Sequence, residues 1–127
     1  KNKFDISTLA LKIKDNKICQ NKNIVKVSTK KNITLKTSER ALNFNRYLKK
    51  RKKNLYQHIG IYQYSVSALE KFSNLKRSKN EIKNKLEQMR ALDNKISINV
   101  ILAKKNVVGI DTKEDYIELK KIMEYKA

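Results

Sequence analysis

The stretch His58-Ile-Gly-Ile-Tyr62-Gln-Tyr64 decides the predicted fold of this chain. Successive side chains of a strand point to opposite faces, so His58, Gly60, Tyr62 and Tyr64 share one face while the two isoleucines point to the other. The stretch contains the only histidine of the chain and one of its two glycines. Tyr62 is expected about 13 Å along the strand from His58, which gives a polar face long enough for an extended ligand.

On the C-terminal side of this strand, the spacing predicts helices. Ser67 and Ser78 are each followed three residues later by a glutamate, Glu70 and Glu81, as in a capping box that opens a helix. A strand and a last helix, beginning near residue 112, follow them. The apolar positions of the second helix are Ile82, Leu86, Met89 and Leu92. Those of the strand are Ile96, Ile98, Val100 and Leu102, and those of the last helix are Tyr116, Leu119, Ile122 and Met123.

On the N-terminal side, residues 7–13 alternate with Leu9, Leu11 and Ile13 on one face, which predicts a half-buried strand. Residues 24–27 and 33–36 are predicted to form a hairpin around the polar residues 30–32. Residues 41–56 are weakly periodic and very basic, and are expected to be a loop. Strands interleaved with helices indicate an α/β layered fold.

Length and charge narrow the function classes. A chain of 127 residues fits one domain, or a piece of one, so residues 1–127 are taken as a single domain or domain fragment. The 31 basic residues exceed the 12 acidic ones and give a net charge of +19. Such a charge can indicate a nucleic-acid partner. Scattered lysine, with abundant Asn and Ile and no Pro, favours AT-rich coding as its origin instead, and nucleic acid is not expected as a partner.

The remaining composition indicates an intracellular protein. The run Lys49 to Lys53 is expected to be a solvated loop. Cys19 stands alone, which excludes a disulfide framework and fits a reducing compartment. No apolar run approaches the ~20 residues of a membrane span, and the start has no signal-peptide pattern. We therefore expect a cytoplasmic protein without membrane contact.

Several ordered segments resemble the C-terminal half of 3-deoxy-manno-octulosonate (KDO) cytidylyltransferase, the CMP-KDO synthetase of lipopolysaccharide biosynthesis. The segments are Asn21 to Val27, Arg40-Ala41, His58 to Tyr64, Ser78 to Arg90 with its Leu-Glu-Gln-x-Arg ending, and Gly109-Ile-Asp-Thr-Lys-Glu-Asp115. The resemblance implies the C-terminal part of a Rossmann-like nucleotide-diphospho-sugar transferase fold, a mixed sheet with flanking helices. This half would provide sugar binding and dimerisation.

The resemblance also implies site residues. His58 and Tyr62 would line the sugar site, and Glu87 and Gln88 would contact KDO; their donors and acceptors suit a polyhydroxylated acid. Asp111 would be the catalytic residue that binds Mg²⁺, because hard oxygen ligands suit that ion.

Two basic residues could also contact the ligands. Arg40 would clamp the sugar carboxylate or a phosphate. Lys26 is either a surface lysine or a substrate contact.

The family activity is transfer of CMP from CTP to KDO, which yields CMP-KDO and pyrophosphate. The family's N-terminal half, with its phosphate loop, is not in this chain, so CTP should have little to hold it here. The chain is expected to need that half, or a second chain, as a partner and to form a homodimer. It could be part of a split enzyme, a truncated product or a diverged remnant.

Substitutions in the family motifs loosen the local geometry. Lys22 replaces a proline, Glu39 and the pair Asn43-Phe44 replace small and proline positions beside Arg40, and Asn84 replaces a glutamate. Two functions of other classes remain open. One is a basic nucleic-acid-binding module, and the other is a noncatalytic interaction or dimerisation remnant of the same fold.

Overall fold

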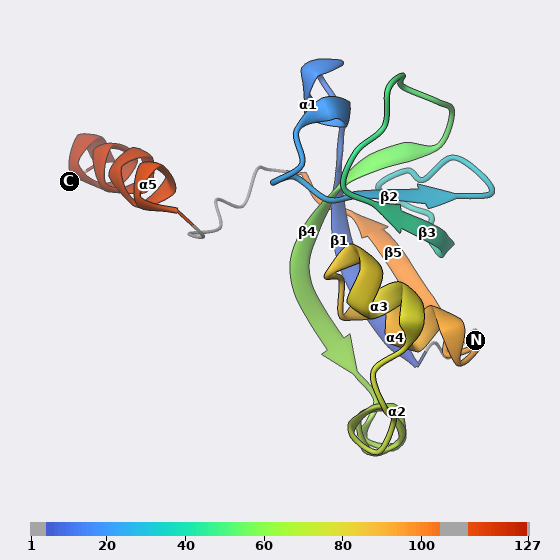
Figure 1. Ribbon diagram of the computed structural model, residues 1–127. Coiled ribbons are helices and arrows are strands. Elements are labelled where there is room, and N and C mark those ends of the chain that lie inside the picture. Colours follow the sequence, from blue (N-terminus) through green and yellow to red (C-terminus); the bar gives the residue numbers. More distant parts are fainter. Residues whose placement is uncertain (1–4, 105–111, 127) are drawn as a thin grey trace.

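The computed structural model describes residues 5–104 and 112–126. Strands and helices both occur along this part of the chain, and Figure 1 shows their arrangement. In chain order the elements are β1 (Ile6–Lys12), α1 (Lys17–Gln20), β2 (Lys26–Thr29), β3 (Glu39–Asn45), β4 (Leu55–Tyr64), α2 (Val66–Ser73), α3 (Lys79–Asn84), α4 (Gln88–Asp93), β5 (Ile98–Leu102) and α5 (Lys113–Lys126).

The strands form a closed barrel in the order β1-β4-β2-β3-β5. β1 and β5 run parallel, whereas the other pairings are antiparallel. This mixed sheet with accompanying helices confirms the predicted α/β class, although barrel closure was not predicted. The pairing of β3 with β5 is short, with Glu39 opposite Val100 and Arg40 opposite Asn99.

The main core fills the inside of the barrel and extends under α2 and α4. Alternation along each strand places one set of side chains inside, and the fully buried examples include Ile6, Ala10, Val27, Ile98 and Val100. A second, smaller cluster contains Ile13, Cys19 and Leu55. Cys19 is therefore a buried small hydrophobe, as its sequence context predicted.

The predicted N-terminal strands are partly correct. β1 and β2 confirm strands near residues 7–13 and 24–27, but the hairpin with residues 33–36 is wrong. Thr34 and Thr37 instead close a tight turn through reciprocal backbone hydrogen bonds of 3.3 Å. The strand paired with β2 is β3, in the region that was expected to start a loop.

The expectation of a loop over residues 41–56 is confirmed for residues 46–54 and wrong at both ends, which belong to β3 and β4. β3 was missed because the register of β2 and β3 is irregular. A bulge between Ser28 and Thr29 shifts the pairing, so the buried residues of β3, Ala41 and Phe44, are three positions apart. The alternation of a regular strand is thus missing from the sequence of β3. The end of the same region, Leu55 and Tyr56, belongs to β4.

The predicted caps and stripe of the helices also need correction. Ser65, not Ser67, caps α2, because its hydroxyl accepts a 3.1 Å hydrogen bond from the Ala68 amide. The predicted capping box at Ser78 and Glu81 is confirmed.

The predicted continuous stripe from Ile82 to Leu92 is broken. Lys85 adopts a left-handed conformation with φ of 53°, which ends α3, and α4 begins separately at Gln88. Ile82 is consequently exposed, whereas Leu86 and Met89 are buried.

α5 starts where the sequence predicted a helix. Thr112 and Asp115 form a reciprocal cap: the Thr112 hydroxyl accepts from the Asp115 amide, and the Asp115 carboxylate accepts from the Thr112 amide. In the predicted stripe, Tyr116 and Met123 are exposed. Within residues 5–104 and 112–126, no helix combines the length and apolar character needed to cross a bilayer.

Candidate functional site

A continuous row of aromatic rings runs along β4. The rings come from β3, β4 and α2, and neighbouring centroids are 5.0, 5.5, 6.1 and 5.9 Å apart. In order, the members of this aromatic row are Phe44, His58, Tyr62, Tyr64 and Phe72. The row contains two predicted site residues, His58 and Tyr62, and places them in direct contact.

A bulge in β4 explains why His58 and Tyr62 are closer than their spacing suggested. Thr8 of β1 pairs with Tyr62 and Leu9 pairs with Ile59, so β4 carries extra residues between these pairs. The rings are 5.5 Å apart, although a regular strand would separate the two positions by about 13 Å. The Thr8 hydroxyl lies 2.8 Å from the Ile61 carbonyl oxygen and 3.2 Å from that of Ile59, which stabilises the bulge.

Thr8 also determines which ring nitrogen of the neutral His58 carries the proton. Nε2 of His58 lies 2.8 Å from the Thr8 hydroxyl oxygen. A hydroxyl has one proton, and the carbonyl oxygens of Ile59 and Ile61 can only accept it. The Thr8 proton is therefore directed to these carbonyls, and Nε2 must donate to Thr8. His58 is then the Nε2–H tautomer, and its Nδ1 presents a lone pair as a hydrogen-bond acceptor.

Burial keeps the His58 ring neutral. The pKa of His58 is lowered from 6.5 to about 4 because desolvation penalises the charged imidazolium. The sequence suggested a histidine that donates to a sugar. With Nε2–H engaged by Thr8, the atom left for a ligand is an acceptor.

Glu87 lies within electrostatic reach of the same face. Desolvation raises the pKa of Tyr62, and negative charge on Tyr64 and Glu87 raises it further. Desolvation, together with Glu87, raises the pKa of Tyr64 as well. Tyr62 therefore keeps its phenolic proton and can donate it to a ligand, whereas the exposed Glu87 carboxylate can only accept. Gln88 is the first residue of α4 and is half-buried.

An ion pair fixes the helix that carries Glu87 and Gln88. Arg90 of α4 binds Glu81 of α3 through two hydrogen bonds, Nε to Oε1 at 2.8 Å and Nη2 to Oε2 at 2.6 Å. The Arg90 guanidinium also lies over the Phe72 ring, 4.7 Å from its centroid. The hydrogen bonds from Arg90 lower the pKa of Glu81. This contact joins three helices at the end of the aromatic row.

Arg40 does not join this face. Its neighbour Glu39 pairs with Val100, a core residue, so alternation places Arg40 on the opposite face of β3. Arg40 is exposed and pairs in register with Asn99.

Lys26 is a structural residue. Its side chain is fully buried, and its ammonium donates to the backbone carbonyls of Asn21, Ile24 and Arg46. Desolvation lowers the pKa of Lys26. Because all three donors of the ammonium are engaged, none is left for a substrate.

The predicted magnesium site falls outside the part of the chain that the structure describes. Asp111 belongs to residues 105–111, so its role stays a prediction. Among the described residues, no group of three or more His, Cys, Asp or Glu side chains could hold a metal ion. The described donor set thus supplies no complete site, and no step of the reaction is assigned to the ion.

Sequence reasoning missed Thr8 and the role of Phe44. Thr8 is a buried residue of β1, together with Ile6 and Ala10. Leu9 and Leu11, which were expected on the buried face, are only partly buried. Because the expected face was wrong for these residues, no sequence signal pointed to an inward hydroxyl. Phe44 had no such signal either, because the irregular register of β3 hid its inward position.

Sequence comparison identifies relatives over nearly the whole chain. No protein-family model matches. Among curated proteins, one from Bartonella bacilliformis is 39% identical over 123 residues, one from Thermodesulfovibrio yellowstonii 44% over 121, and one from Agrobacterium fabrum 37% over 120. The alignments cover 96, 91 and 94% of this chain but 50, 48 and 47% of those proteins. The chain therefore spans about half the length of the curated relatives it matches.

A solved structure shows the same fold. The structure of a CMP:2-keto-3-deoxy-manno-octonic acid synthetase complexed with CTP matches 98% of this chain with a TM-score of 0.81, and the match covers 51% of that protein. Sequence identity is 24%, so this likeness concerns the arrangement of the elements.

The sequence matches show that the chain is related to part of a cytidylyltransferase. The three relatives bear one name, and the chain is thus a relative of the 3-deoxy-manno-octulosonate cytidylyltransferases, which confirms the resemblance predicted from its motifs.

Proposed function

We propose that this chain supplies the sugar-acid-binding half of an enzyme that transfers CMP from CTP to KDO. The observation that carries the proposal is the contact between the His58 and Tyr62 rings, with Glu87 within electrostatic range of Tyr62, in a chain whose relatives are named for this reaction. In the complete enzyme, the anomeric hydroxyl of KDO attacks the α-phosphorus of CTP, a new P–O bond forms, and pyrophosphate leaves.

The chemistry of this face suits the hydroxyl groups of a sugar. His58 Nδ1 and the Glu87 carboxylate are acceptors, and the protonated Tyr62 hydroxyl is a donor. Sugar hydroxyls can satisfy both kinds of partner, whereas a sugar carboxylate would be repelled by Glu87. The carboxylate of KDO is therefore assigned to another part of the site. Arg40 lies on the opposite face of its strand, so a cation of the other half of the enzyme is the proposed partner.

The partners and the finer fold belong to the same proposal. The chain would complete a Rossmann-like nucleotide-diphospho-sugar transferase fold together with an N-terminal half that holds CTP, and the assembled enzyme would be a homodimer. Asp111 would contribute one oxygen ligand to Mg²⁺, which neutralises phosphate charge when bound.

Binding of KDO to the chain alone tests whether the face that carries His58 and Tyr62 is the sugar site. We expect saturation-transfer NMR to show KDO binding, and the Tyr62→Phe variant to weaken it by about tenfold through loss of one buried donor. Tyr47→Phe is a matched control, because Tyr47 is half exposed and lies outside the aromatic row. Equal binding by Tyr62→Phe and wild type would contradict the assignment of this face to KDO.

Turnover tests the division of labour. The chain alone should release no pyrophosphate from CTP and KDO. Mixing it with the unmatched half of the Bartonella bacilliformis relative should restore release. Turnover by the isolated chain would overturn the proposal that CTP is bound elsewhere. A remnant without catalytic function would bind no KDO and restore no turnover.

A further inference from the structure

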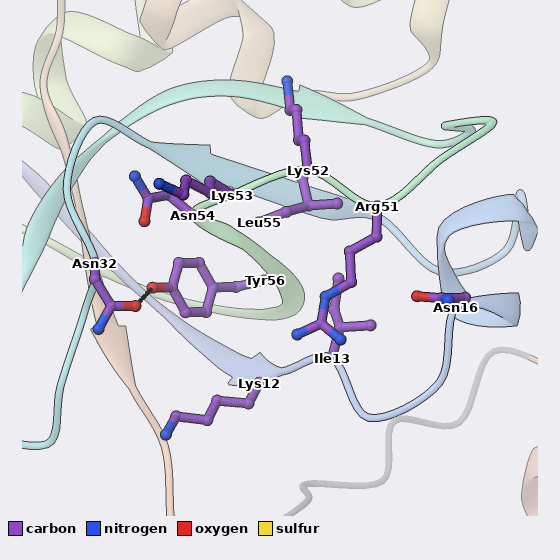
Figure 2. Close-up of a pocket in the computed structure, with 10 residues that line it drawn as sticks. All are labelled: Lys12, Ile13, Asn16, Asn32, Arg51, Lys52, Lys53, Asn54, Leu55 and Tyr56. Atoms are coloured by element: carbon purple, nitrogen blue, oxygen red, sulfur yellow. Dashed lines mark hydrogen bonds between the residues drawn. The ribbon is translucent and has the colours of Figure 1, made fainter.

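A second candidate site lies near the N-terminal end of β4, at the other end of the strand from Tyr62 and Tyr64. It is a cavity of about 660 Å³ between the end of β1, the segment before α1 and residues 51–56 (Figure 2). Its lining residues are Lys12, Ile13, Asn16, Asn32, Arg51, Lys52, Lys53, Asn54, Leu55 and Tyr56. We call this cavity the basic pocket.

The charge of the basic pocket has a single sign. Lys12, Arg51, Lys52 and Lys53 line it, and none of its lining residues is acidic. In the described part of the chain, these cations form no ion pair or hydrogen bond. Arg46, from the same basic region, shows the contrast, because its guanidinium donates to the backbone carbonyls of Lys22, Asn84 and Lys85. The cations of the pocket are therefore available to an anion.

The floor of the basic pocket is held in place. The Tyr56 hydroxyl donates to Asn32 Oδ1 at 2.7 Å and accepts from the Ile33 amide at 2.8 Å. Asn54 has a φ of 55° and donates through Nδ2 to the Lys30 carbonyl at 2.8 Å. Leu55 is buried in the second core cluster. These contacts fix residues 54–56, which directly follow the three consecutive cations, so part of the ordering cost of binding is met before a ligand arrives.

We propose that the basic pocket binds a short oligophosphate chain, either free or as part of a nucleotide. Arg51 reaches into the space between Ile13 and Tyr56, Lys12 and Lys53 line other sides of the cavity, and Lys52 points away from it (Figure 2). The planar arginine fork can engage phosphate oxygens in pairs, and the two lysines add positive charge for the rest of such a chain. The volume falls in the range of about 300–1,000 Å³ that is usual for small-molecule sites.

Single-stranded nucleic acid fits the basic pocket less well. Proteins that bind it combine cations with aromatic faces on which bases stack. The one aromatic lining residue is Tyr56, which is buried and has its hydroxyl paired on both sides. The pocket therefore recognises phosphate and offers no stacking surface. This inference is independent of the proposed sugar site.

Calorimetric titration with tripolyphosphate at low salt tests the inference. Wild type should bind with saturation at one site. The Arg51→Gln/Lys53→Gln variant should bind about tenfold more weakly, from loss of two nearby charges. Both residues are exposed, so the variant should keep the thermal midpoint of wild type. Lys113→Gln/Lys121→Gln, with the same change of charge on exposed residues of α5, is the matched control and should bind like wild type.

Two results would overturn the inference. Equal weakening by the two double variants would show that net charge, and not the basic pocket, attracts the anion. Tighter binding of a single-stranded oligonucleotide than of tripolyphosphate, affected equally by both variants, would favour a diffuse nucleic-acid surface. Comparison of tripolyphosphate with CTP then separates the free chain from the nucleotide. Equal affinity means that the phosphates alone are recognised, and tighter CTP binding means that the nucleoside contributes.

Discussion

Protonation of His58 should destabilise the chain in mildly acidic solution. The folded-state pKa is about 4, below the ordinary value of 6.5, so the unfolded state binds more protons between these two values. The stabilisation is therefore fully present above about pH 6.5 and is lost as the pH falls toward 4. The shift corresponds to a total of about 3 kcal/mol, of which about 2 kcal/mol should be lost by about pH 5.

Urea unfolding of wild type and His58→Gln as a function of pH measures this loss. His58 is the only histidine of the chain, so the difference between the two pH profiles isolates its titration from that of the carboxylates. Absolute stabilities will differ because the variant also loses ring contacts with Phe44 and Tyr62. The free energies of the two proteins should therefore converge by about 2 kcal/mol between about pH 7 and pH 5.

NMR of the imidazole provides the direct check. The ring should titrate near pH 4, and its nitrogen shifts at neutral pH should report the Nε2–H tautomer. A midpoint near 6.5, parallel pH profiles for wild type and variant, or the Nδ1–H tautomer would refute the described environment of His58.

Three further substitutions test other parts of the structure. Glu81→Gln should lower the free energy of unfolding by about 3 kcal/mol at neutral pH, since it leaves Arg90 without its charged partner. Because the pKa of Glu81 is lowered, the difference in unfolding free energy from wild type should shrink as acid protonates Glu81. A difference that does not change with pH would contradict this reasoning. Lys26→Met should cost at least about 2 kcal/mol in urea unfolding, because buried carbonyls lose their donor, and an unchanged midpoint would be the contrary result. Asp111→Asn should lower pyrophosphate release by the assembled enzyme and raise the Mg²⁺ concentration that this release requires, while leaving KDO binding by the chain unchanged. Wild-type Mg²⁺ dependence would remove Asp111 from the proposed metal site.

The sequence predicted correctly those strands and helix caps that have a regular pattern or a characteristic residue spacing. β1, β4 and β5 alternate or carry aromatic runs, and Ser78 with Glu81 forms the capping box that its spacing indicated. β3 was missed because its burial does not alternate regularly. Closure of the barrel was also beyond local patterns, since it depends on pairing between strands far apart in the chain.

The candidate site was likewise predicted in part: its residues could be named from the sequence, but their hydrogen bonding could not. Motif resemblance brought together His58, Tyr62, Glu87 and Gln88, and in the structure the His58 ring contacts Tyr62 while Glu87 lies within electrostatic range of Tyr62. The direction of the His58 hydrogen bond could not be predicted, because it depends on Thr8 of another strand and on a bulge. The roles of these residues toward KDO stay predictions until binding is measured.

Closure of the sheet limits how any second half of the enzyme can attach. Each described strand has a neighbour on both sides, but two of the pairings are short: β2 pairs with β4 only over Leu55 to Gln57, and β3 pairs with β5 only at Glu39 and Arg40. A second half of the proposed enzyme could therefore add a strand only beside these short pairings, and would otherwise attach through contacts between side-chain surfaces. β1 is paired along both sides over most of its length, so this part of the barrel offers no free edge for aggregation.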